Sequence, residues 1–97
     1  MATATTLNAE LLRVLWACHA YWLTEPVPAE ERSVCFSWVE GSYRQRFGGT
    51  FHQSMLATLA KLGFLVPDDT SCGGNRRYYR LSDPQMIREL VAEFDLA

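Results

Sequence analysis

The residues best suited to binding a ligand lie in the segment RRYYRLS at positions 76–82. Alternation along an extended strand places Arg76 and Arg80 on one face, opposite the apolar side formed by Tyr79 and Leu81. Guanidinium groups hold phosphate and carboxylate oxygens through several hydrogen bonds at once. The segment therefore predicts a cationic strand that holds a polyanion.

A second group of polar side chains follows the glycine turn FGGT at positions 47–50. Thr50, His52 and Gln53 are expected in the first half of a helix, facing outward. Gln53 can pair with N6 and N7 of adenine, and His52 can donate to a base or a phosphate. Lys61 lies further along, where it suits a phosphate. The structural alternative is that Gln53 only caps the helix and His52 is an ordinary surface residue.

Three more polar residues extend this set. Asn75 lies at the expected loop tip, while Arg44 and Arg46 suit either backbone contacts or the negative end of a helix dipole. The strand arginines also have a structural alternative, because Asp68 and Asp69 stand across the hairpin and can pair with one or two of them. The full set of candidate contact residues is Thr50, His52, Gln53, Lys61, Asn75, Arg76, Arg77, Arg80, Arg44 and Arg46.

Charge is unevenly distributed along the chain. The net charge is −2, yet residues 41–80 carry six basic and two acidic side chains, a net +4. Residues 1–40 and 81–97 each carry a net −3. A polyanion responds to the local field more than to the total charge. The basic middle segment indicates either a nucleic-acid face or a solvated basic surface.

Hydrophobic periodicity and capping residues predict the elements that position these groups. Asn8 is a good N-cap for a strongly apolar first helix. Thr50 and Gln53 form a capping-box pattern, and Gly63 is typical of a helix stop. Asp83 can cap the last helix. We expect helices over 9–23, 33–46, 50–62 and 84–95, with a β-hairpin over 64–82.

The 97 residues are expected to form a single domain over 1–97. Its class is mainly α with a small β-hairpin, in the order helix, helix, helix, strand, strand, helix. Two helices joined by a short glycine turn and followed by a hairpin describe a winged helix-turn-helix.

The stretch SMLATLAKLGFLVPDD…GGNRRYYRLSDP resembles the second half of PadR-type and MarR-type winged-helix transcriptional regulators, over about residues 50–84. In those families a leucine-rich L-x-x-L-x-x-x-G helix end precedes a wing that closes on an R-x-Y-Y-x-L-(S/T) strand. The matching residues here are Leu56, Leu59, Gly63, Arg76 or Arg77, Tyr78, Tyr79, Leu81 and Ser82. A fainter resemblance, through SYRQRFGGTF, is to the RNA-associated LOTUS domain.

The resemblance implies sequence-specific binding of double-stranded DNA by a small transcriptional regulator, with the third helix in the major groove and the wing on the backbone or minor groove. The wide apolar face of the first helix also predicts a homodimer, formed through that helix and the C-terminal helix. A second hypothesis uses the same fold as a protein–protein interaction module without DNA binding. The acidic ends of the chain favour that alternative.

No enzymatic activity, cofactor or metal is expected, because the chain has no P-loop, dinucleotide glycine pattern or nucleophile elbow. Cys18, Cys35 and Cys72 are too widely spaced for a disulfide framework or a zinc site. A metal site shared across a dimer and a thiol sensor at Cys72 stay open as alternatives. The chain has no long apolar run and no signal-peptide pattern, so we expect a cytoplasmic protein without a membrane partner.

Overall fold

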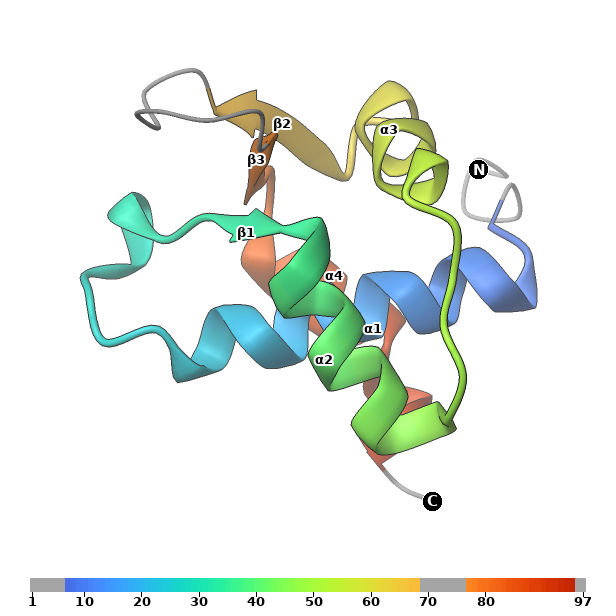
Figure 1. Cartoon of the computed structure of the whole chain (residues 1–97). Coiled ribbons are helices and arrows are strands. Elements are labelled where there is room, and N and C mark those ends of the chain that lie inside the picture. Colours follow the sequence, from blue (N-terminus) through green and yellow to red (C-terminus); the bar gives the residue numbers. More distant parts are fainter. Residues whose placement is uncertain (1–6, 69–76, 96–97) are drawn as a thin grey trace.

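The computed structural model describes residues 7–68 and 77–95, and Figure 1 shows the arrangement of its elements. In chain order these are α1 (Ala9–Thr24), η2 (Ala29–Glu31), β1 (Val34–Cys35), α2 (Phe36–Phe47), α3 (Ser54–Lys61), β2 (Leu65–Asp68), β3 (Tyr78–Leu81), α4 (Pro84–Leu90) and η3 (Ala92–Asp95). The prediction of a mainly helical chain with a small antiparallel β component is confirmed.

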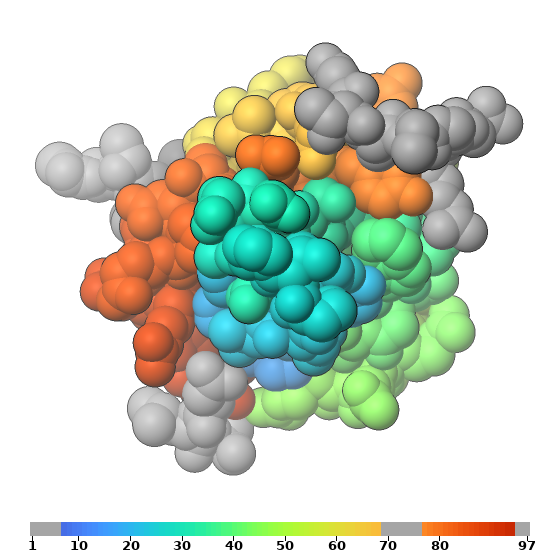
Figure 2. Space-filling view, turned by 90° about the vertical axis from the view of Figure 1, so that its left-hand side faces the viewer, coloured from blue at the N-terminus to red at the C-terminus, as the bar shows by residue number. Residues whose placement is uncertain are grey.

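Helix α1 forms the centre of the domain. Its start is held by Asn8, whose side-chain oxygen accepts a hydrogen bond of 2.8 Å from the Leu11 N–H. Figures 1 and 2 show α2 and α4 on different sides of α1, and both helices contact it. The apolar residues buried on α1 are Leu11, Val14, Leu15, Ala17, Cys18 and Trp22.

The packing of α1 covers part of the apolar surface on which the predicted homodimer depends. The sequence pattern predicts that part of the apolar surface of α1 needs a second chain to cover it. Within the chain, Val14, Leu15 and Cys18 are completely buried, and α2, α3 and α4 all contact this helix. Leu23 on the same helix is 58% exposed, and Leu12 and Trp16 are half-buried, so pairing through α1 and the C-terminal helix stays a prediction.

The sheet contains one strand more than the predicted hairpin. β1 pairs antiparallel with β3, with Val34 opposite Tyr79, so the order of the sheet is β1-β3-β2. The prediction that a helix begins at residue 33 is therefore wrong, because Val34 and Cys35 are extended and α2 begins at Phe36. A strand of two residues has no period that sequence analysis can detect.

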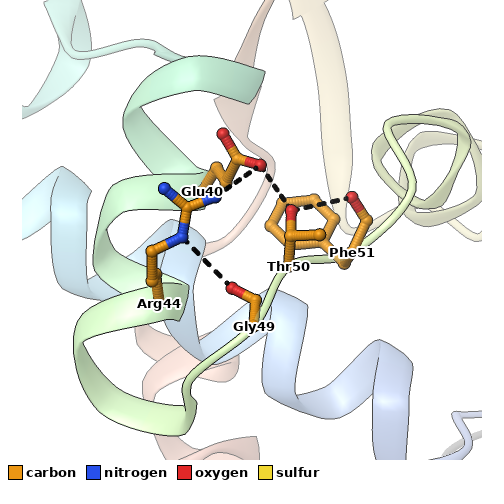
Figure 3. Close-up of polar contacts among 5 residues, drawn as sticks. All are labelled: Glu40, Arg44, Gly49, Thr50 and Phe51. Carbon is orange, nitrogen blue, oxygen red and sulfur yellow. Dashed lines mark hydrogen bonds and ion pairs between the residues drawn. The ribbon is translucent and has the colours of Figure 1, made fainter.

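The third helix begins later than the capping pattern predicts. Instead of Ser54 being the fifth residue of a helix over 50–62, it is the first residue of α3. Thr50 lies four residues before α3 and does not cap it, and its hydroxyl donates to a carboxylate oxygen of Glu40 on α2 (Figure 3). This tertiary contact holds Thr50 in the connection between the two helices.

Helix α3 ends at a glycine, as the sequence predicts. Gly63 has a φ of 94°, which a residue with a side chain rarely adopts. The Phe64 N–H donates to the Leu59 carbonyl at 2.9 Å, and the Gly63 N–H donates to Ala60 at 3.0 Å. The hydroxyl of Ser82 then donates to the Gly63 carbonyl at 2.6 Å and joins this turn to the end of β3.

The C-terminal helix is shorter than the predicted range 84–95. Asp83 caps α4 by accepting from the Met86 N–H at 3.2 Å, and Pro84 occupies the first turn. Helix α4 ends at Leu90, and a separate short 3-10 helix, η3, follows over Ala92–Asp95. The two strands of the hairpin flank residues 69–76, which lie outside the described part of the chain, as do the predicted contacts Asn75 and Arg76 and the thiol of Cys72.

Candidate nucleic-acid interface

A groove of about 480 Å³ opens where the starts of α2, α3 and β3 meet. Its walls come from three parts of the sequence that only the fold brings together. The residues that line it are Cys35, Phe36, Ser37, His52, Gln53, Ser54, Leu56, Ala57, Arg77 and Tyr79. Three of the predicted contact residues, His52, Gln53 and Arg77, therefore share one concave surface.

His52 organises the start of α3. Its Nδ1 accepts a hydrogen bond of 3.1 Å from the Ser54 N–H and lies 2.8 Å from the Ser54 hydroxyl. An imidazole nitrogen that accepts from a backbone N–H carries no proton, so in this arrangement the proton of neutral His52 is on Nε2. Gln53 occupies the N-cap position of α3, but its side chain makes no capping hydrogen bond. The first N–H of the helix is accepted by His52 instead, whose Nε2–H stays available as a donor.

The outward side of α3 is polar and carries small side chains. Leu56 and Leu59 are buried against the core, whereas the opposite side is exposed. The exposed residues on and before this helix are His52, Gln53, Ser54, Ala57, Thr58 and Lys61. Small side chains on one side of a helix let that side approach a partner closely, and the amide of Gln53 offers both a donor and an acceptor.

Arg77, just before β3, and Arg80, within it, line two different grooves. Arg77 lines the groove beside α3. Arg80 does not, because its Nε donates to Asp68 at 3.3 Å and its side chain borders a different groove. Of these two arginines, Arg77 lines the groove beside α3 and Arg80 lines another groove, as expected of side chains three positions apart on a strand.

The two arginines of α2 are also outside the groove. The Nη2 of Arg44 lies 3.3 Å from the Glu40 carboxylate, and its Nε donates to the Gly49 carbonyl at 3.4 Å (Figure 3). Arg46 donates to the Phe94 carbonyl at 2.8 Å. Both guanidinium groups therefore stabilise turns and ends of their own chain, and neither lines the surface that contains His52 and Arg77.

The electrostatics of the groove favour an anion. Positions 41–67 contain no Asp or Glu, and they include all of α3. Among the described residues that line the groove, Arg77 is charged and none is acidic. The first acidic residue that follows α3 in the sequence is Asp68, and its carboxylate is paired with Arg80. A negatively charged ligand would meet little repulsion on this surface.

Sequence analysis missed the contribution of α2 to the groove. Ser37 and Phe36 line it because β1 pairs with β3 and so brings the start of α2 next to Arg77. Cys35 and Tyr78 lie far apart in the sequence, and their pairing in the sheet brings the start of α2 close to Arg77. No local pattern around Ser37 distinguishes it from other exposed serines.

The thiols that could carry other chemistry in the described part of the chain are buried. Cys18 and Cys35 are free and buried, and burial raises the pKa of the Cys18 thiol. No group of His, Cys, Asp or Glu side chains within residues 7–68 and 77–95 has the arrangement of a metal site. No helix in this part of the chain has the length and apolar character needed to cross a bilayer.

Comparison with known proteins adds no family to these observations. No family model, no curated protein and no solved structure matches the chain. The functional proposal therefore rests on the groove itself.

Proposed function

We propose that this chain is a winged-helix transcriptional regulator that binds double-stranded DNA through α3 and Arg77. The observation that carries the proposal is the groove, in which His52 and Gln53 at the start of α3 lie beside a guanidinium of the wing strand. Two elements that contact DNA in such proteins, the third helix and the wing, would then face the same side.

The topology supports the fold assignment within this proposal. A strand, two helices, and an antiparallel hairpin follow one another, and the first strand pairs with the last at the centre of the sheet order β1-β3-β2. Helix α3 contacts β2 and α1 and keeps its polar side exposed, as a reading helix requires.

The residues of the exposed side have chemically distinct roles in this proposal. Gln53 would contact adenine in the major groove through its amide, and His52 would donate from Nε2 to a base or a phosphate. Lys61 and Arg77 would contact phosphates on either side. Arg44, Arg46 and Arg80 are left out of the interface because each already serves a contact within the chain.

The proposal is tested by fluorescence anisotropy with a short labelled duplex of mixed sequence, titrated at several salt concentrations. Binding should weaken as salt rises, since phosphate contacts release counterions. Arg77→Ala should reduce the slope of log K against log salt by about one. Arg88→Ala is the matched control, because Arg88 is an exposed arginine on α4, outside the groove lining.

Two results would overturn the proposal. One is the absence of binding at low salt by a chain that melts cooperatively, and the other is an equal effect of Arg77→Ala and Arg88→Ala. Either result would favour the protein-interaction alternative for this groove. If binding is found, sedimentation of the complex tells whether one or two chains occupy each duplex. This measurement tests the expected homodimer directly.

A further inference from the structure

A second groove lies on another side of the molecule, between the end of α1, the segment before β1, and the start of α4. Figure 2 shows this side, with the segment after α1 in teal at the centre and the orange and red chain of β3 and α4 next to it. The groove measures about 340 Å³ and is lined by Trp22, Ala29, Glu30, Arg32, Arg80, Leu81 and Pro84. None of these residues lines the groove beside α3.

Arg32 is held in a fixed position on one wall of this second groove. Its Nε donates to the Val27 carbonyl at 2.8 Å and its Nη1 donates to the Trp22 carbonyl at 3.3 Å. The guanidinium carbon lies over the Trp22 ring, 4.6 Å from its centre, which is a cation–π contact. A guanidinium has five N–H donors, and these two bonds leave three of them for a ligand.

Arg80 supplies a second guanidinium from a distant part of the sequence. Its contact with Asp68 uses Nε, at 3.3 Å, which leaves the hydrogens of both terminal nitrogens. Its side chain is 44% exposed, whereas that of Asp68 is 8% exposed. The side chain of Asp68 is therefore largely buried, while that of Arg80 reaches solvent at the groove.

Apart from the two arginines and Glu30, the residues that line this groove are apolar. Trp22 and Leu81 keep 8% and 7% of their surface exposed, while Pro84 is half-buried and has no N–H to offer. A bare inorganic anion would leave this surface in water. An anion that carries a hydrocarbon group would cover it and gain the burial of apolar area.

We propose that this second groove binds a small organic carboxylate, with its oxygens on Arg32 and Arg80 and its hydrocarbon part against Trp22, Leu81 and Pro84. A planar carboxylate matches the fork of a guanidinium and accepts two parallel hydrogen bonds from it. The volume of about 340 Å³ is at the small end of ligand pockets, which indicates a small molecule and not a protein segment. This binding does not depend on the proposed DNA-binding function.

Glu30 lets the proposal predict opposite effects on carboxylate affinity for two substitutions in the same groove. Among the described residues that line the second groove, Glu30 is the acidic one, and it is exposed. Its carboxylate repels an incoming anion and competes for the same arginines. Neutralising Glu30 should therefore strengthen carboxylate binding, while removing the charge of Arg80 should weaken it.

The test uses hexanoate as the probe, with hexanol and inorganic phosphate as comparison ligands, on the isotopically labelled protein followed by NMR. Hexanoate should shift the side-chain N–H signals of Arg32 and Arg80 and the indole N–H of Trp22, and hexanol should shift the arginine signals far less. Arg80→Gln should raise the Kd for hexanoate about tenfold. Glu30→Gln should lower it several-fold, and Arg88→Gln on α4 should leave it unchanged.

Arg32→Lys is the direct variant, but it also removes contacts that hold the segment after α1, so its melting temperature is measured alongside. The deciding variants are Arg80→Gln and Glu30→Gln. Equal shifts with hexanoate and hexanol, or equal affinities for Arg80→Gln and Arg88→Gln, would overturn the proposal. So would tighter binding of phosphate than of hexanoate, because phosphate cannot use the apolar lining. No DNA is present, so these outcomes leave the test of α3 and Arg77 untouched.

Discussion

The guanidinium of Arg46 lies 2.8 Å from the carbonyl oxygen of Phe94, a hydrogen bond that spans 48 positions of sequence. The same guanidinium lies 5.2 Å from the ring centre of Phe47 and 5.8 Å from that of Trp16. The rings of Phe47 and Phe94 meet edge to face at 5.5 Å. One arginine thus joins the end of α2 to α1 and to η3.

Replacing this arginine should destabilise the chain measurably. Arg46→Ala is expected to lower the free energy of unfolding by about 1 kcal/mol, because it removes a charged hydrogen bond and cation–π contacts at a partly solvated site. Arg44→Ala is the control, since its ion pair with Glu40 is exposed and is expected to contribute about 0.5 kcal/mol or less. Urea unfolding followed by circular dichroism measures both. Equal losses would mean that the contact with Phe94 adds nothing specific.

The connection between α2 and α3 should depend on the pair formed by Thr50 and Glu40. The Thr50 hydroxyl donates to the Glu40 carboxylate, so Thr50→Val and Glu40→Gln should each destabilise the chain. A double-mutant cycle should give a coupling of about 1 kcal/mol, the usual size for a hydrogen bond to a charged group near the surface. Thr58→Val is a matched control, because the Thr58 hydroxyl donates to Ser54 within its own helix. Additive losses at Thr50 and Glu40 would contradict the pairing.

The cap of α4 gives a third prediction. Asp83→Ala should cost about 1 kcal/mol of stability, since the Met86 N–H would lose its acceptor. Asp83→Asn should retain most of that stability, because an amide oxygen caps nearly as well. Thermal unfolding of the two variants side by side measures the difference. A loss of the same size in both would indicate that the charge, and not the hydrogen bond, stabilises this end of the helix.

The buried thiol of Cys18 predicts a dependence of stability on alkaline pH. Burial raises its pKa well above the ordinary value of about 9, so the unfolded chain releases this proton at a lower pH than the folded chain does. The stability contributed by the protonated thiol is fully present below pH 9 and falls as pH rises above it. The pKa of Tyr21 is also raised, by burial and then by the Glu25 carboxylate, and adds to the fall above pH 10.

The slope attributable to Cys18 is at most one proton, or about 1.4 kcal/mol per pH unit. Urea midpoints between pH 8.5 and 10 should fall less steeply for Cys18→Ala than for the natural chain, even though the variant is less stable at neutral pH because of the cavity it creates. Parallel curves for the two proteins would show that the thiol does not titrate differently in the folded state.

Local signals in the sequence were sufficient for several elements and misleading for one. Asn8 and Asp83 cap the helices that they are expected to cap, because each hydrogen bond joins residues three positions apart. The capping box predicted from Thr50 and Gln53 does not form. The helix begins only at Ser54, and the Thr50 hydroxyl donates to Glu40, ten residues earlier, a partner about which a pattern within four residues contains no information.

The strand β1 shows the same limit at longer range. Val34 and Cys35 precede a helix and carry no strand pattern of their own, and they become extended because Tyr79 and Tyr78 offer them a partner. Hydrogen-bonding partners across a sheet are set by the fold and not by neighbouring residues.

The sequence by itself determined the helical periodicity, two of the helix caps, the glycine end of α3 and the basic character of the middle of the chain, because each of these depends on residues within a turn or two of one another. Only the tertiary structure decided which neighbours each arginine near the wing strand meets. Pairing of β3 with β1 brings Arg77 to the start of α3, while pairing with β2 brings Arg80 to Asp68. Alternation along the strand already separates these two arginines, which lie three positions apart, and the tertiary structure decides what each face meets because the partner strands and α3 come from distant parts of the sequence.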